Sequence, residues 1–168
     1  MPSESARAAS AAEARFRIND PNSRPRAIKV IALDHPSEGV VKRLARSAWT
    51  NASFLIALSS EPARGERFSM SGWLSDLAGH TLDLVDEIDN ADLVVMIATA
   101  GNNTEAASIV GEACSLKRVM TTALILADPS ISDAALSRSL AQLRPWALML
   151  VVASAEEYIA DMLAALRA

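Results

Sequence analysis

The sequence predicts a three-layer α/β fold, in which an open and mainly parallel sheet of about five strands carries helices on both faces. Runs of β-branched and aliphatic residues alternate five times with segments whose apolar residues recur at helical spacing. The run Leu93–Ala98 is apolar without alternation, which is typical of a central strand covered on both faces. Strands that follow one another through helices are parallel, and their crossovers are right-handed.

The strands and helices can be assigned in order along the chain. The predicted strands are residues 28–33, 53–58, 93–98, 122–126 and 148–152. The predicted helices follow the turn at Asp34 and fill most of residues 71–90, with Gly79 as a break between two pieces, then about 104–116, 132–144 and the end of the chain. Ile109 is expected to face inward, Ser132 is a candidate N-cap, and Ser154 with Glu157 fits a capping box.

Length and composition predict one domain of ordinary globular type. The chain has 168 residues, of which 51% are hydrophobic and 21% are charged. Residues 1–26 are rich in Ala, Ser, Arg and Pro and are predicted to be a disordered N-terminal arm, which leaves 27–168 as a single α/β domain. The net charge of −4 disfavours nucleic acid and anionic lipid as partners.

Several kinds of site are disfavoured by the residues the chain lacks. Cys114 is the only cysteine, so neither an intramolecular disulfide nor a cysteine-rich metal site can form. His35 and His80 are the only histidines, so we expect no metal, and nothing in the sequence indicates a cofactor. There is no apolar run of about 20 residues and no secretory signal, so we expect a cytoplasmic protein with no membrane contact.

A ligand site in such a fold lies outside the carboxyl ends of the strands, where the strand order reverses. The polar and glycine residues that follow the first four predicted strands are therefore the candidate ligand-binding residues. They are Asp34, His35, Ser59, Gly101, Asn102, Asn103, Thr104 and Asp128.

The turn from Thr99 to Thr104 is the most informative of these segments. Gly101 permits close backbone approach, and a helix capped by Asn103 or Thr104 would present backbone N–H groups to an anion. The alternative is that these residues only cap the helix. Glu105 favours that alternative, because a carboxylate in the first turn already interacts with the helix dipole and would repel a phosphate.

Catalytic residues cannot be assigned from the sequence. Asp34 and His35 could act as a general acid/base pair at the mouth of the site, but an Asp-His dipeptide in a turn is also a common coincidence. No motif places a serine or cysteine nucleophile. Cys114 lies between small residues of a predicted helix and is expected to be a core residue.

The order of these pieces resembles the GTP-binding domain of the FtsZ/tubulin family, a Rossmann-like domain. Residues 28–33 and 39–44 look like its first strand and helix, and residues 91–101 look like the strand that enters its phosphate loop. Residues 103–110 are similar to the helix start after that loop, and residues 122–152 are similar in order to the later nucleotide domain. The resemblance covers about residues 27–160.

The glycines on which the family's chemistry depends are missing. The family's first glycine-rich turn is replaced by Asp34–Gly39, and its phosphate loop is shortened to Gly101–Thr104. Thr104 matches a loop position, but the glycine after it is Glu105. Carboxylates beside a polyanion are repulsive, and the chain leaves no room for the family's second domain, so we do not expect GTP hydrolysis.

Three hypotheses follow. The leading one is a non-catalytic or regulatory binding module on a degenerate FtsZ-like scaffold, with a homo-oligomer among the expected assemblies. The alternative is a small enzyme or a sugar-phosphate- or nucleotide-binding protein that uses the strand-end crevice, since residues 100–105 also resemble the turn of SIS sugar-phosphate domains. The third is a protein-interaction domain recruited through the arm. Whether the partner is a protein or a small ligand is not indicated by the sequence.

Overall fold

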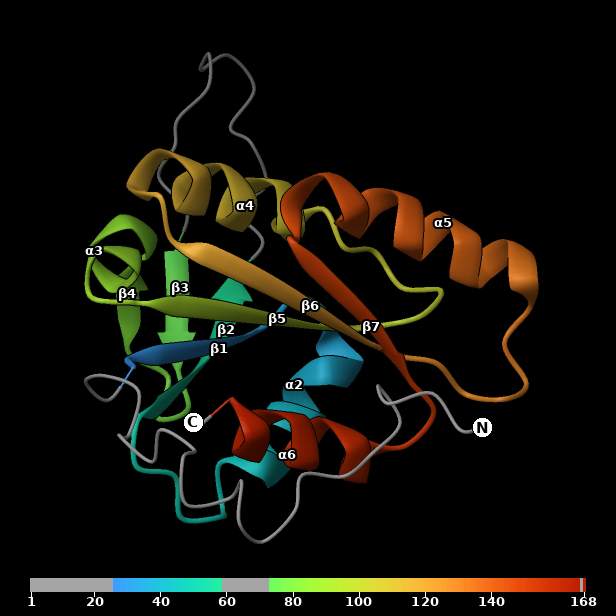
Figure 1. Ribbon diagram of the computed structural model, residues 1–168, viewed down its shortest axis with the longest axis horizontal. Helices are drawn as coiled ribbons and strands as arrows, with labels where there is room; N and C mark the ends of the chain where they lie inside the picture. The colour runs from blue at the N-terminus through green and yellow to red at the C-terminus, as the bar shows by residue number, and fades with distance from the viewer. Residues whose placement is uncertain (1–25, 59–72, 167) are drawn as a thin grey trace, which may run out of the picture.

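The computed structural model describes residues 26–58, 73–166 and 168 of the chain. They form an open sheet of seven strands with the order β4-β3-β2-β1-β5-β6-β7, shown in Figure 1. The strands are β1 (Ile28–Ala32), β2 (Ala52–Leu58), β3 (Trp73–Asp76), β4 (Thr81–Asp83), β5 (Leu93–Thr99), β6 (Met120–Leu126) and β7 (Met149–Ala153). The helices are α2 (His35–Leu44), α3 (Leu84–Asp89), α4 (Ala106–Lys117), α5 (Asp133–Leu143), the 3-10 turn η2 (Arg144–Trp146) and α6 (Glu156–Ala165).

Five of the strands are parallel, as the alternation of strands and helices predicts. The strand β1 pairs with β2 on one side and with β5 on the other, both in parallel. After β1 the chain adds β2 on one side of it and later places β5 on the other side. The strand order therefore reverses between β1 and β5. In open α/β sheets ligands bind outside the carboxyl ends of the strands at such a point.

Helices cover both faces of the sheet and divide the core in two (Figure 1). Side chains of α3, α4 and α5 pack on one face, where Met96 and Ile125 are fully buried. Side chains of α2 and α6 pack on the other face, around Val95 and Ile97. The apolar run of β5 is buried on both faces, which confirms its predicted central position.

The segment predicted as a helix from residue 71 to 90 is mostly a β-hairpin. The strands β3 and β4 extend the sheet antiparallel beyond β2, and only Leu84–Asp89 is helical. Gly79 does not divide a helix; with φ of +91° it belongs to the hairpin turn. The prediction was wrong because Leu74 and Leu82, which look like a helical stripe, pair across the hairpin instead. The sheet thus has seven strands rather than about five.

The helix starts agree only in part with the capping signals. Ser132 caps α5 as predicted, accepting a hydrogen bond from Ala135 N. The predicted capping box at Ser154 is not formed, because Ala155 is the N-cap of α6 and no side chain caps it. Ile109 of α4 is 37% exposed rather than buried, since the helix turns Val110 and Ala113 toward the sheet.

Two predictions fall on residues that the structure does not describe. These are the N-terminal arm, of which only Arg26 belongs to the described part, and the candidate site residue Ser59. Within the described ranges, no helix has the length and apolar character that a membrane crossing requires.

Candidate functional site

Asp34 begins α2 and is held by a reciprocal pair of hydrogen bonds with Ser37. Its Oδ1 accepts from Ser37 N at 2.8 Å, and its own backbone N–H donates to Ser37 Oγ at 3.1 Å. This is a capping box with serine in the third position of the helix. Ser37 is fully buried, so the start of α2 is fixed by a local sequence pattern, Asp-x-x-Ser.

The second carboxylate oxygen of Asp34 reaches across the point where the strand order reverses. Its Oδ2 accepts from Thr99 N at 2.6 Å, and Thr99 is the last residue of β5. Leu33 N also donates to Ile97 O, at 2.9 Å, so the two strand ends are joined by backbone and side chain together. One carboxylate thus binds two backbone N–H groups that lie on opposite sides of the expected ligand crevice.

The side chain of His35 lies in solvent and does not contact the Asp34 carboxylate through a hydrogen bond. The side chain of His35 is 94% exposed, and its Nδ1 lies 3.7 Å from Glu38 Oε1. The other oxygen of Glu38 lies 3.7 Å from Lys42 Nζ. Among the described residues no hydrogen bond joins the imidazole to the Asp34 carboxylate, so the geometry gives no support to the acid/base pair proposed for Asp34 and His35.

The turn after β5 is attached to α5 by two polar contacts. Gly101 N donates to Ser139 Oγ at 2.9 Å, and Thr104 Oγ1 donates to Gln142 Oε1 at 2.5 Å. Thr104 and Ser139 are 1% and 2% exposed, so both hydroxyls are buried, whereas Gln142 is exposed at the surface of α5. The hydroxyl of Thr104 therefore faces α5 and does not cap α4.

Gly101 is required by the backbone of this turn. Its φ is +85°, and a Cβ at this position would lie 3.0 Å from Cδ1 of Ile131. Asn102 N donates to Thr99 O at 3.2 Å, which closes the turn. Asn103 Oδ1 accepts from Glu105 N at 3.0 Å, but the N-cap of α4 is Glu105, and no side chain caps it. The predicted cap by Asn103 or Thr104 is therefore replaced by a local Asn103 turn.

Asp128 follows β6 and stabilises its own loop. Its Oδ1 accepts from Ser130 N at 2.8 Å and from Ser130 Oγ at 2.5 Å. These hydrogen bonds lower the pKa of Asp128 below its ordinary value, with the side-chain bond as the larger cause. The residue is exposed, and among the described residues no hydrogen bond joins its side chain to Asp34 or Gly101.

The described candidates therefore make three different sets of side-chain hydrogen bonds, although the first two meet at Thr99. Asp34 and the end of β5 form one, the Gly101–Thr104 turn with α5 forms the second, and the Asp128 loop is the third. Ser139 and Gln142 were missed by the sequence reasoning because both lie on the polar face of a predicted helix, and only the folded chain brings them to the turn. Ser37 could have been found from its capping-box spacing.

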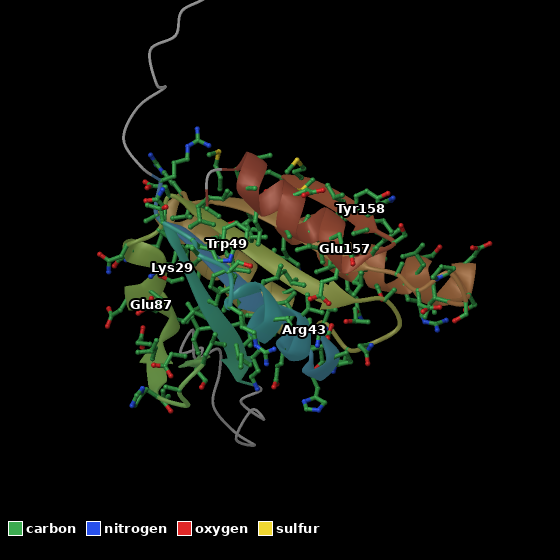
Figure 2. All side chains as sticks on the ribbon, turned by 90° about the horizontal axis from the view of Figure 1, so that it is seen from below. Lys29, Arg43, Trp49, Glu87, Glu157 and Tyr158 are labelled. Atoms are coloured by element: carbon green, nitrogen blue, oxygen red, sulfur yellow. The ribbon has the colours of Figure 1, made fainter. Side chains whose placement is uncertain are left out.

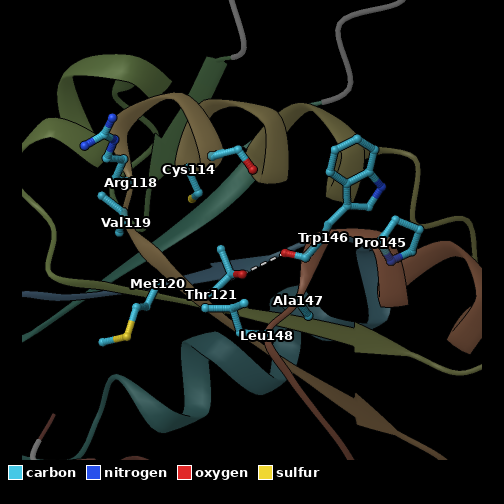
Figure 3. Close-up of a pocket in the computed structure, with 10 residues that line it drawn as sticks. Cys114, Arg118, Val119, Met120, Thr121, Pro145, Trp146, Ala147 and Leu148 are labelled. Atoms are coloured by element: carbon cyan, nitrogen blue, oxygen red, sulfur yellow. Dashed lines mark hydrogen bonds between the residues drawn. The ribbon is translucent and has the colours of Figure 1, made fainter.

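A groove of about 280 Å³ lies at the opposite end of the sheet, where α4 ends and β7 begins. Figure 3 shows Trp146 beside α4 and the hydrogen bond of 2.7 Å from Thr121 Oγ1 to Trp146 O. Cys114 also lines this groove, and burial raises the pKa of its thiol to about 12. The thiol therefore stays protonated at neutral pH, which agrees with the core role expected from the sequence.

The comparisons with known proteins support the fold. No protein-family model and no curated protein sequence matches the chain. The apo-form flavoprotein of Lactobacillus acidophilus superposes with a TM-score of 0.50 at 7% identity, over 82% of this chain and 99% of that protein. The translation elongation factor SelB of Methanococcus maripaludis, in its apo form, superposes with a TM-score of 0.41 at 12% identity, over 83% of this chain and 36% of SelB. At 7% identity the likeness to the flavoprotein concerns the α/β fold alone.

Proposed function

We propose that this chain is a non-catalytic or regulatory binding module, built on an FtsZ-like scaffold that has lost its phosphate loops. GTP hydrolysis is not expected of it. The observation that carries the proposal is the position of the Asp34 carboxylate, which accepts from Ser37 N and Thr99 N at the reversal of the strand order.

The Asp34 carboxylate occupies the backbone donors that a phosphate would use. The N–H groups at a helix N-terminus form a generic anion site, and Ser37 N belongs to the first turn of α2. A phosphate bound there would have to replace a hydrogen-bonded carboxylate or lie beside it, and like charges a few ångströms apart repel. Glu38 in the same turn adds a further negative charge.

The polar groups of the Gly101–Thr104 turn, the second possible phosphate site, are also hydrogen-bonded within the chain. Gly101 N is bonded to Ser139, and the Thr104 hydroxyl is bonded to Gln142. Glu105 occupies the N-cap of α4, where its carboxylate opposes a bound anion. Both turns at the reversal point thus favour a scaffold that is closed to phosphates.

Calorimetric titration of the full chain tests the proposal directly. The ligands are GTP, GDP and ATP, each with and without Mg²⁺, and FMN, which is included because one structural neighbour is described as a flavoprotein. We expect no heat of binding with any of them. Tight, magnesium-dependent binding of a guanine nucleotide would overturn the proposal.

A variant separates the effect of Asp34 from a general lack of affinity. Asp34→Ser keeps an N-cap side chain but releases Thr99 N and one negative charge. We expect inorganic phosphate to raise the melting temperature of Asp34→Ser and not that of the natural chain, because a ligand that binds the folded state stabilises it. Asp128→Ser, which removes an exposed carboxylate from the neighbouring strand end, is the matched control and should not respond. If phosphate does not raise the melting temperature of Asp34→Ser either, occupancy of these backbone donors by Asp34 is not the reason that the natural chain fails to bind phosphate.

One observation favours the second candidate function, a small enzyme or small-molecule-binding protein. Thr99 Oγ1 is buried at the end of β5 with no hydrogen-bond partner among the described residues, and a buried hydroxyl usually has one. A small polar ligand without phosphate could supply it, and the exposed His35 lies on the neighbouring turn. A thermal-shift screen of sugars, sugar phosphates and small acids tests this candidate, and a ligand whose effect disappears in Thr99→Val would support it.

A further inference from the structure

The strand β7 is an edge strand without the features that usually protect one. It pairs with β6 on one side, and no described strand pairs with its other side. Residues 148–153 contain no charge and no proline. Leu148, Met149 and Val152 are 80%, 40% and 46% exposed. An exposed, uncharged and apolar edge is a template for pairing with a further strand, and natural monomers usually interrupt it with lysine, proline or a bulge.

A groove lies beside this edge, on the face that carries α6. It has a volume of about 510 Å³ and is lined by β7 together with Tyr158, Asp161 and Met162 of α6. Tyr158 is 62% exposed on α6, and Figure 2 shows it on the outer side of that helix. Tyrosine is enriched at protein interfaces because its ring adds apolar area while its hydroxyl can stay hydrated.

The charges around β7 are separated along the strand direction. Because β6 and β7 are parallel, α4 and η2 end beside their amino ends, and α5 begins beside their carboxyl ends. The exposed cations at the amino end include Arg118 and Arg144, and the exposed anions at the carboxyl end include Asp128 and Asp133. None of the four has an ion-pair partner among the described residues.

We propose that β7 pairs with β7 of a second copy of this chain, in antiparallel orientation, around a two-fold axis perpendicular to the sheet. Such an axis keeps α5 of both copies on the same face and places the amino end of one β7 beside the carboxyl end of the other. Arg144 of each copy then lies at the end where the other copy has Asp133. A parallel arrangement would instead bring like charges together, so the charge pattern selects the antiparallel dimer.

This dimer is independent of any ligand at the strand ends. It covers the uncharged edge and continues the sheet from one copy into the other, and it brings both α6 helices with their exposed Tyr158 side chains to the interface. A two-fold contact is self-complementary, so one exposed edge per chain is enough to close the assembly.

Sedimentation velocity of the full chain over a range of concentrations tests the proposal. We expect a concentration-dependent dimer whose dissociation constant rises about tenfold or more in Val152→Lys and in Leu148→Lys, because each lysine charges the edge. Leu148 is 80% exposed, so its substitution is tolerated by the monomer fold even if that of Val152 is not. The matched control is Leu77→Lys, which charges an exposed leucine in the hairpin turn at the other side of the sheet and should leave the dimer intact.

The antiparallel orientation has its own test. Arg144→Glu and Asp133→Arg each place like charges at both ends of the interface, so each variant alone should dimerise more weakly. Mixing the two variants should restore a heterodimer, because every cross-copy pair is then of unlike charge. A natural chain that stays monomeric at its highest soluble concentration overturns the proposal. A dimer insensitive to both edge lysines, or a mixture that is no tighter than its components, overturns it as well.

Discussion

The two edge strands of the sheet, β4 and β7, differ in length and in the polarity of their exposed side chains. On one side, β4 has three residues, carries the exposed Thr81 and finishes at Asp83, which caps α3 by accepting from Val85 N and Asp86 N. On the other side, β7 has five uncharged residues with exposed apolar side chains. Short polar edges resist pairing with other chains, whereas long apolar ones invite it. This difference between the two edge strands is the basis of the pairing proposed for β7, and the predictions below test it.

The largest expected effect comes from a substitution at Gly111, where α4 packs closely against the turn that precedes β7. A Cβ at this position of α4 would lie 2.6 Å from Cβ of Trp146, in the turn that leads into β7. The contact involves an atom next to the backbone, so α4 or the turn must shift. We expect Gly111→Ala to reduce the free energy of unfolding by about 1–3 kcal/mol, measured by urea denaturation.

Gly39→Ala is the matched control, since both glycines lie inside helices. A Cβ at Gly39 would lie 3.3 Å from a terminal nitrogen of Arg43, and this flexible side chain can move away. The free energy of unfolding should then be unchanged or higher by about 0.5–1 kcal/mol, because alanine is the better helix former. Equal losses in the two variants would show that the close packing of Trp146 is not the cause.

A smaller effect is expected from the hydrogen bond that holds the start of β7. Thr121→Val keeps the shape of the side chain but leaves Trp146 O without its donor. The expected loss is about 1 kcal/mol. Alkylation of Cys114 should become faster, because this buried thiol lines the same groove and ionises to the reactive thiolate more readily when the groove opens to water. Thr122→Val is the control, because no hydrogen bond of the Thr122 hydroxyl is found in the described part of the chain. Unchanged alkylation of Thr121→Val would contradict the role given to this bond.

The smallest effect is expected at the β3–β4 turn, on the opposite side of the sheet from β7, where the Asp76 side chain stabilises the turn. Its carboxylate accepts from Ala78 N and His80 N and lies 2.8 Å from His80 Nδ1. These hydrogen bonds, with the His80 side chain as the largest cause, lower the pKa of Asp76 below its ordinary value. The carboxylate therefore stabilises the fold fully above its unfolded pKa of about 4, and the contribution disappears as the pH falls through the lower folded value.

Thermal melts of Asp76→Asn as a function of pH measure this contribution. The variant should melt below the natural chain at neutral pH, and the difference should shrink in acid. Asp86→Asn, at an exposed position of α3, is the control for the loss of a surface carboxylate. A difference between Asp76→Asn and the natural chain that stays constant into strong acid would exclude the ionised carboxylate as its source.

The parallel half of the fold could be predicted because its signals are local. The β-branched runs of β1, β5 and β6 and the N-cap at Ser132 depend on residues close in sequence. The hairpin could not be predicted in the same way, because Leu74 and Leu82 match a helical stripe as well as a pair of facing strand residues. What decides between the two is the free side of β2, with which β3 pairs, and this contact is remote in sequence.

The candidate site shows the same division. The position of Asp34 at a strand end follows from the order of elements, and the sequence identified it. The second oxygen of Asp34 binds Thr99, which lies 65 residues away along the chain, and Gly101 and Thr104 bind side chains 38 residues away. No spacing rule contains these partners. They exist only once β5 lies beside β1 and α5 packs over the turn.

The amino-acid sequence by itself determined the alternation of strands and helices, and with it the layers, the parallel core and the edge where polar turn residues gather. Those features follow from side-chain periodicity, which is a property of neighbours along the chain. The tertiary structure alone decided that the Asp34 carboxylate fills the backbone donors at the reversal point, and that β7 ends the sheet with an uncharged edge. Both depend on which distant segments lie side by side, and periodicity carries no information about that.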